Sequence, residues 1–246
     1  MAKGIYVATS GSVAQLRHLE TLSSNLANTR TAGFKGDRLD FETVRARSVR
    51  EGGGTGADPE GLDKHYVDVR DRRTDLAAGP VTRTNNPLDV AMTANAFLTV
   101  ETDKGTRLTR DGRLVLGRDG ALRTQSGHAV LDASGRTIHL PPDRVPTIDE
   151  QGNIRAGDMP VGRLGLVGVD LREGLEKDLD GHFVPPDGAA ALLPNAGVLQ
   201  GHLEESNVRP VQAMLELVEV QRTFSALRQV ITTSGELDQL ASRLPQ

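Results

Sequence analysis

Apolar residues recur at helical spacing at both ends of the chain. Near the N-terminus they follow one another at steps of three or four residues, at Val13, Leu16, Leu19, Leu22 and Leu26. This pattern predicts a helix over about residues 4–28. It fails over residues 28–33, where β-branched residues and a glycine should end the helix.

A second helix is predicted over about residues 207–243. Its apolar positions form a heptad-like seam with steps of 4, 3, 4, 3 and 4, at Ala213, Leu217, Val220, Phe224, Leu227 and Ile231. Ser206 or Asn207 is expected to cap the helix, and Pro210 suits its first turn. Gly235 is expected to interrupt it.

The intervening stretch, about residues 66–200, has the pattern of an all-β domain. Strand-like runs at 96–100, 113–116 and 128–131 alternate with Asp-Gly and Ser-Gly pairs that are typical of tight turns. Arg-Asp-Gly occurs at 110–112 and again at 118–120, and we expect successive hairpin turns there. Prolines scattered from residue 141 to residue 194 argue against long helices.

These patterns divide the chain into four segments. They are an N-terminal helix (1–30), an extended arm with a flexible loop (31–65), a central β domain (66–203) and a C-terminal helix (204–246). The loop is expected at residues 51–63, which hold five glycines and a proline. The predicted fold class is mixed but mainly β, with a central all-β domain bracketed by two helices that pack on each other or on copies of themselves.

The amino-acid composition excludes several classes of function. The 246 residues include no cysteine, which excludes disulfides, thiolate metal sites and cysteine nucleophiles. Aromatic residues make up 3% and the net charge is −4, so neither base stacking nor general nucleic-acid binding is favoured. No apolar run is long enough for a membrane-spanning helix, and the N-terminus lacks the apolar core of a cleaved signal peptide.

Positive charge is concentrated early in the chain. Residues 1–50 carry eight Lys or Arg against four Asp or Glu, and five of those cations are Lys35, Arg38, Arg45, Arg47 and Arg50. This stretch is either a solvated face or an arm that meets an acidic surface on a partner.

No reactive cluster emerges from the sequence. The six histidines stand alone, and no nucleophile elbow, phosphate-binding loop or dinucleotide fingerprint occurs. The DLDG run at 178–181 lacks the further ligands of a calcium loop and predicts a tight turn. The acidic pairs Glu204-Glu205 and Asp149-Glu150 are expected at the surface. No catalytic residue, cofactor or metal is therefore predicted.

Three stretches together resemble the rod and hook family of bacterial flagellar axial proteins. The first is LSSNLANTRTAGFK (22–35), the second comprises NPLDVA (86–91) and LTRDG (108–112), and the third is QGHLEESNV (200–208). Three positions depart from the family pattern: ANAFL (94–98) replaces a glycine-rich GxGFF, Leu108 replaces an aromatic residue, and Arg209 replaces Asn or Asp. The short chain and the GIYVATSG opening favour a proximal rod protein over a distal one, and exclude the longer hook protein.

The resemblance implies a structural subunit of the flagellar basal-body rod that transmits torque. Its terminal helices would pair as a coiled-coil layer inside a helical tube, with the β domain outside. Expected partners are other rod and hook-family subunits, copies of the chain itself and the flagellar export apparatus, with neither nucleic acid nor membrane insertion. The expected location is the periplasm-spanning rod, reached without a cleaved signal peptide.

The expected assembly residues are the apolar faces of the helices and the turns beside them. They are Leu16, Leu19, Leu22, Leu26, Asn28, Gly33, Phe34, Val208, Leu217, Val220, Phe224, Leu227 and Ile231. The alternatives are a distal rod or other hook-like axial subunit, and a cell-wall-cleaving β-protein with a carboxylate pair about 5–10 Å apart.

Overall fold

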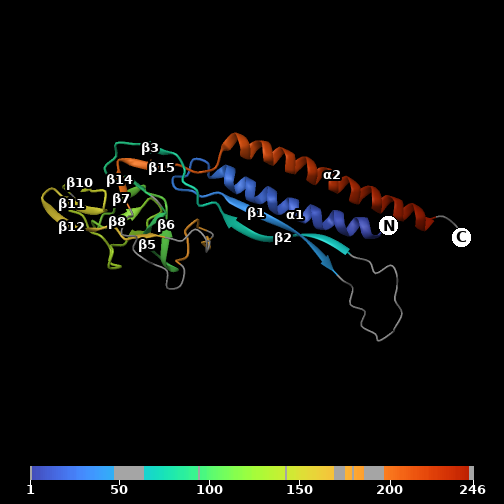
Figure 1. Cartoon of the computed structure of the whole chain (residues 1–246), viewed down its shortest axis with the longest axis horizontal. Coiled ribbons are helices and arrows are strands. Elements are labelled where there is room, and N and C mark those ends of the chain that lie inside the picture. Colours follow the sequence, from blue (N-terminus) through green and yellow to red (C-terminus); the bar gives the residue numbers. More distant parts are fainter. Residues whose placement is uncertain are drawn as a thin grey trace, which may run out of the picture. The chain divides into compact units, whose positions relative to one another are not determined.

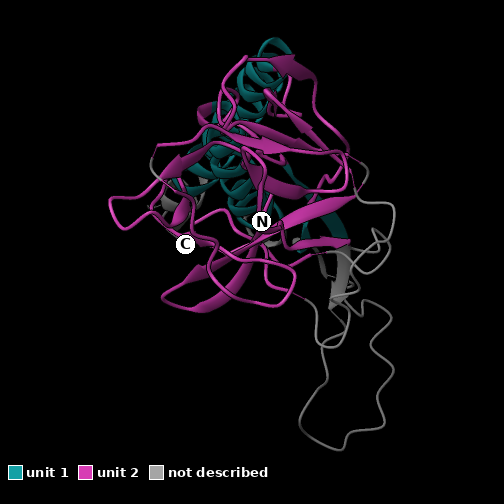
Figure 2. Cartoon of the chain, turned by 90° about the vertical axis from the view of Figure 1, so that its left-hand side faces the viewer, with its two compact units in different colours: residues 1–26, 37–73, 210–246 teal, residues 27–36, 74–209 magenta. Residues whose placement is uncertain are grey.

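The computed structural model of the chain describes residues 2–46, 64–93, 95–141, 143–168, 175–178, 180–185 and 197–243. These residues fall into two compact units, which are coloured separately in Figure 2. Unit 1 comprises residues 1–26, 37–73 and 210–246, and unit 2 comprises 27–36 and 74–209. The chain therefore passes from one unit to the other four times, after residues 26, 36, 73 and 209. The loop expected at 51–63 lies outside the described residues.

Unit 1 contains both helices, α1 (Ala2–Ala27) and α2 (Pro210–Arg243). They run side by side in opposite directions (Figure 1). A methyl group added to Gly11 of α1 would lie 3.4 Å from the Leu227 side chain of α2. Small residues on α1, with Ala8 and Ala14 buried, leave room for this approach.

The bounds of α1 confirm the predicted N-terminal helix to within two residues at each end. The start of α2 differs from the prediction. The helix begins at Pro210, which confirms the first-turn proline, but neither Ser206 nor Asn207 caps it. The Asn207 side chain instead binds the backbone of Gly36 and Asp75 in unit 2. Nor does Gly235 interrupt the helix, because one glycine costs only about 1 kcal/mol relative to alanine.

A two-stranded ribbon accompanies the helices in unit 1, formed by β1 (Asp37–Ala46) and β2 (Lys64–Thr74). Ion pairs join the strands, with the Arg72 guanidinium on the Asp37 carboxylate and Arg73 Nε 3.2 Å from Asp40 Oδ2. Phe41 of β1 contacts His18 of α1 edge to face, with ring centroids 5.4 Å apart. The Asn25 side chain of α1 exchanges two hydrogen bonds with the Asp37 backbone, at 2.8 and 2.9 Å.

Unit 2 holds the remaining strands, in small antiparallel sheets. Their bounds are β3 (Val81–Arg83), β4 (Val90–Met92), β5 (Ala96–Thr102), β6 (Gly105–Thr109), β7 (Leu114–Leu116), β8 (Leu122–Thr124), β9 (Ala129–Val130), β10 (Pro146–Ile148), β11 (Asn153–Ala156), β12 (Met159–Arg163), β13 (Leu166–Gly168), β14 (Val198–Gln200) and β15 (His202–Glu204). The largest sheet has the order β13-β5-β9-β8-β7, and β6 also pairs with β5. Strands β10, β11 and β12 form a separate three-stranded sheet.

Two apolar clusters stabilise unit 2. The larger gathers alternate residues of β5, such as Leu98 and Val100, with Leu122 and Ile154 from other strands. The smaller brings Phe97 from the opposite face of β5 against Phe183, with ring centroids 5.3 Å apart. No helix occurs among the described residues between 74 and 209. The prediction of a mainly β chain with a helix at each end is therefore confirmed.

Most of the predicted turns are present. Gly120, Gly127 and Gly135 have positive φ and close the turns expected from Asp-Gly and Ser-Gly pairs. The expectation of a hairpin turn at 110–112 was wrong, because β6 pairs with β5 whereas β7 pairs with β8. Gly112 serves close packing instead, since an added Cβ would lie 1.7 Å from the Val90 carbonyl oxygen.

Candidate functional site

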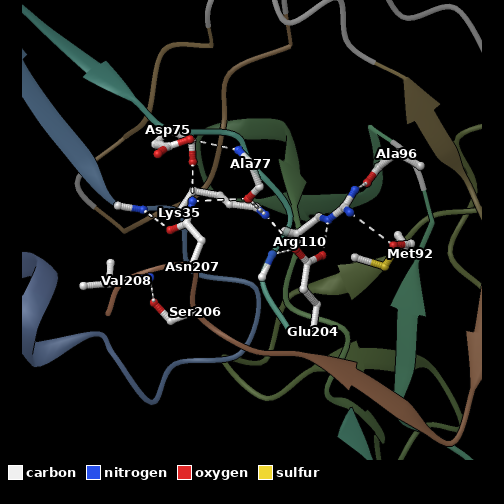
Figure 3. A network of polar contacts seen from close by, with 12 residues as sticks. Lys35, Asp75, Ala77, Met92, Ala96, Arg110, Glu204, Ser206, Asn207 and Val208 are labelled. Carbon is white, nitrogen blue, oxygen red and sulfur yellow. Dashed lines mark hydrogen bonds and ion pairs between the residues drawn. The ribbon is translucent and has the colours of Figure 1, made fainter. Parts of the chain in front are cut away.

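The three sequence stretches that carry the family resemblance converge in unit 2, at a network of buried polar groups (Figure 3). Lys35 comes from the first stretch, Arg110 from the end of β6 and Glu204 from the end of β15. Their side chains are 1%, 4% and 1% exposed, respectively. We call these three residues the three-charge network.

Glu204 is its centre. Its Oε1 accepts hydrogen bonds from Lys35 Nζ at 2.6 Å and from the Gly79 backbone N–H at 2.8 Å. Its Oε2 accepts one from Arg110 Nε at 2.5 Å. Burial by itself would raise the pKa of Glu204, but the two cations and the backbone N–H outweigh it and lower that pKa. The carboxylate is therefore ionised in the folded protein.

The cations outnumber the anion, and backbone carbonyls bind the remaining N–H groups. Lys35 Nζ also donates to the Ala77 oxygen at 2.7 Å. Arg110 donates to the Met92 oxygen at 3.1 Å and to the Ala96 oxygen. Burial lowers the pKa of Lys35 in spite of its bond to Glu204, and the nearby Arg110 adds to this effect. The bond to Glu204 opposes this lowering, because it favours the charged form of Lys35.

The segment 27–36, which we call the signature loop, packs closely on this network. Gly33 has φ +66° and donates its N–H to the Glu204 backbone oxygen at 2.7 Å. A Cβ at Gly33 would lie 2.2 Å from the Arg110 oxygen, so both the backbone conformation and the available space require glycine. Phe34 lies beneath Lys177, whose Nζ is 3.9 Å from the ring centroid.

Asn207 holds the end of the signature loop through hydrogen bonds. Its Oδ1 accepts the Gly36 N–H at 2.8 Å, and its Nδ2 donates to the Asp75 oxygen at 2.7 Å. Its own backbone N–H donates to the Phe34 oxygen at 3.3 Å. Residues 204–207, which we call the anchor segment, therefore bind the signature loop through both side chains and backbone.

The middle stretch joins the same assembly through its strands. Residues 90–92 form β4, which pairs with β14, the strand that leads into the third stretch; Gln200, the first residue of that stretch, lies opposite Val90. Asn86 donates to the Asp89 carboxylate at 3.0 Å and shapes the turn before β4. Apart from residues 22–26, which belong to unit 1, the three stretches thus form one structural feature of unit 2.

The predicted assembly residues fall into three classes of exposure. Leu16 is exposed, Leu22, Gly33 and Val220 are buried, and the others are partly buried, namely Leu19, Leu26, Asn28, Phe34, Val208, Leu217, Phe224, Leu227 and Ile231. Leu227 approaches α1, whereas Gly33 and Phe34 contact the anchor segment. Asn28 forms a turn, with its Oδ1 accepting Thr31 Oγ1 at 3.0 Å.

Two predictions about charged residues were wrong. Lys35 is not part of a solvated cationic arm, and Glu204 is not a surface carboxylate, because each neutralises the other inside unit 2. Only Glu205 of that acidic pair is exposed. Sequence reasoning also missed Arg110. The only signal in the sequence was that the first family stretch carries cations and the third carries carboxylates, and this does not single out Arg110.

Other polar residues are candidate metal ligands or turn-forming groups. Among the described residues, no group of three or more His, Cys, Asp or Glu side chains could hold a metal ion. The predicted turn at 178–181 is confirmed by the bond from the Gly181 N–H to the Asp178 oxygen at 3.1 Å. Asp149 accepts the backbone N–H groups of Gln151 and Asn153 and so closes another turn. In the part of the chain that is described, no helix is long and apolar enough to span a membrane.

Comparison with known protein families matches both ends of the chain. Residues 5–35 match the family described as "Flagella basal body rod protein", and residues 199–244 match "Flagellar basal body rod FlgEFG protein C-terminal". The first range covers most of α1 and of the signature loop, and the second contains the anchor segment and α2.

Similarity to individual proteins extends over almost the whole chain. A flagellar basal-body rod protein FlgF of Mesorhizobium japonicum is 34% identical and covers 96% of each chain. FlgF of Caulobacter vibrioides is 32% identical over 98% of this chain and 97% of its own. FlgG of Bacillus subtilis is 26% identical over 96% of this chain and 97% of its own.

Proposed function

This chain belongs to the family of flagellar basal-body rod proteins, and we propose that it assembles helically through its two terminal helices to transmit torque. As a member of that family it is a structural subunit of the flagellar basal body and associates with other rod and hook-family subunits. The proposal concerns how its own residues make that association.

The observation that carries the proposal is a second apolar stripe on α2. Within the seam, Ala213 and Val220 are buried, at 5% and 7% exposure, and the other members are partly buried. On the other side of the helix, four apolar side chains are exposed: Val211 (72%), Met214 (53%), Leu215 (68%) and Val218 (45%). Their steps of three, one and three residues place them on one face, roughly opposite the seam at about 100° per residue.

The partner surface that we propose is the exposed face of α1 on another copy of the chain. Val13 and Leu16 are 49% and 45% exposed there. A contact between two different surfaces is heterologous, and such a contact propagates into a helical filament when its rotation does not close a ring. The two helices would then form the coiled-coil layer of the rod, with Leu16 at a contact between copies and Leu22 and Val220 inside each copy.

The absence of cysteine makes this contact directly testable. Leu16→Cys and Leu215→Cys proteins, mixed under oxidising conditions, should form a mixed disulfide dimer in preference to either homodimer. Exclusive Leu215→Cys homodimers would show a symmetric contact and contradict the filament.

Sedimentation over a concentration series provides a second test. Leu215→Lys should abolish self-association, because it places a charge in the stripe, whereas Gln212→Lys adds the same charge on another face of α2 and should leave association intact. Equal behaviour of the two variants would exclude the stripe as the contact.

The same proposal includes export through the flagellar export apparatus without a cleaved signal peptide, and a role without catalysis. It is supported by the rod-protein names of the relatives. A turbidity assay on purified cell wall tests the non-catalytic role, since clearing above the buffer control would favour the cell-wall-cleaving alternative.

A further inference from the structure

We infer that the three-charge network controls how the signature loop (27–36) packs. The loop closes on unit 2 only when the Glu204 carboxylate of the anchor segment (204–207) occupies its buried position. This inference goes beyond the proposed function, because it concerns how the two ends of unit 2 become joined in a single chain.

The first step is the origin of the loop's contacts. Gly33 donates to the Glu204 backbone, Lys35 to the Glu204 side chain and Gly36 to the Asn207 side chain. Lys35 and Glu204 are separated by 169 positions in the chain. A chain made from its N-terminus therefore contains the loop long before it contains the residues that bind it.

The second step is the charge balance. Without Glu204, closure of the loop would bury Lys35 beside Arg110. The hydrogen bonds left to these two cations would be those to backbone carbonyl oxygens, with Asp75 as a further negative charge near Lys35. An uncompensated buried charge is strongly unfavourable, whereas a paired and fully hydrogen-bonded one is tolerated. The signature loop is therefore expected to stay open until the Glu204 carboxylate is in position to bind both cations.

The third step is that closure is local. The apolar clusters of unit 2 form mainly from residues between 90 and 198, and neither includes a residue of the loop or of the anchor segment. These strands can remain folded while the loop opens. Opening of the signature loop should thus affect only an edge of unit 2 and leave its apolar clusters folded.

Hydrogen–deuterium exchange of the full-length protein tests this inference. In Glu204→Gln, the amides of residues 33–36 should exchange about a hundredfold faster, since the buried ion pairs of Glu204 with Lys35 and Arg110 have both been broken. Amides of β5 and β6 should keep their exchange rates. Glu205→Gln is the matched control, because its side chain is exposed, and it should change the loop by less than about twofold.

A double variant separates an effect of charge from a simple loss of hydrogen bonds. Adding Lys35→Met to Glu204→Gln removes the unpaired loop cation, so protection of the loop should recover by about tenfold or more. A double variant that exchanges as fast as Glu204→Gln would overturn the inference. So would an unchanged loop in Glu204→Gln, or equal acceleration in the loop and in β5 and β6.

Discussion

Lys35 and Glu204 meet at 2.6 Å inside unit 2, and each of their side chains is 1% exposed. One belongs to the turn that follows the N-terminal helix and the other to the strand that precedes the C-terminal helix. Their pairing joins, within one unit, the two ends of the sequence by which the family is identified.

Arg110, the third member of the three-charge network, should be as important for the stability of unit 2 as Lys35 and Glu204. Arg110→Met leaves the Met92 and Ala96 carbonyl groups without their donor, and should lower the free energy of unfolding by about 3 kcal/mol. Arg113→Met is the matched control, because Arg113 is 34% exposed and pairs locally with Asp111. It should cost less than about 1 kcal/mol in the same urea titration. Equal losses would mean that burial of Arg110 has no special effect.

Gly33 should tolerate no side chain. Gly33→Ala combines a left-handed backbone with a Cβ placed 2.2 Å from the Arg110 oxygen, so we expect a loss of at least about 3 kcal/mol. Gly105 also has a positive φ, at +90°, but an added Cβ there would meet no atom within 4 Å. Gly105→Ala is therefore the matched control. It should cost only about 1 kcal/mol, the backbone part alone. Thermal unfolding of the two variants distinguishes crowding from backbone strain, and similar losses would rule out the crowding.

Gly11 offers the opposite case. Its added Cβ would lie 3.4 Å from the flexible tip of Leu227, an ordinary contact, and alanine is the better helix former. Gly11→Ala should therefore raise the free energy of unfolding by about 0.5–1 kcal/mol. Gly11→Leu should instead lower it, because a long side chain cannot fit between α1 and α2. Circular dichroism during urea unfolding measures both, and a stabilising Gly11→Leu would contradict the helix pairing.

The turn at Asp132 should make stability depend on pH in acid. Hydrogen bonds from the Ser134 hydroxyl and from the backbone N–H groups of Ser134 and Arg136 lower the pKa of Asp132 to about 2, in spite of partial desolvation. A depressed folded-state pKa stabilises the fold above the ordinary value of 3.8, and this stabilisation is lost as the pH falls from about 4 to about 2.

Asp132→Asn should flatten that dependence between pH 4 and pH 2 and weaken the fold at neutral pH. Stability measured by urea titration at each pH, with an NMR titration of Asp132, checks both effects. A wild-type Asp132 that titrates near 3.8 would disprove the prediction.

Sequence reasoning was most successful where the signal is local. The spacing of leucines such as Leu19 and Leu22 predicted α1, and the seam through Val220 predicted α2, because a helix repeats every 3.6 residues whatever it packs against. Glycine after serine at 127 and 135 predicted turns for the same reason, since turn chemistry depends on adjacent residues. The predicted cap at Asn207 was wrong, because its side chain can cap a helix but binds the signature loop instead.

By itself, therefore, the sequence determined the two helices, the mainly β centre and the family, all of which rest on short-range periodicity or on ordered motifs. Only the tertiary structure decided that Lys35, Arg110 and Glu204 share one buried site, and which apolar face of α2 stays exposed. A single charge has no period, and its partner 169 residues away is chosen by how the intervening strands pair. Which face of a helix is buried depends likewise on the neighbour that covers it.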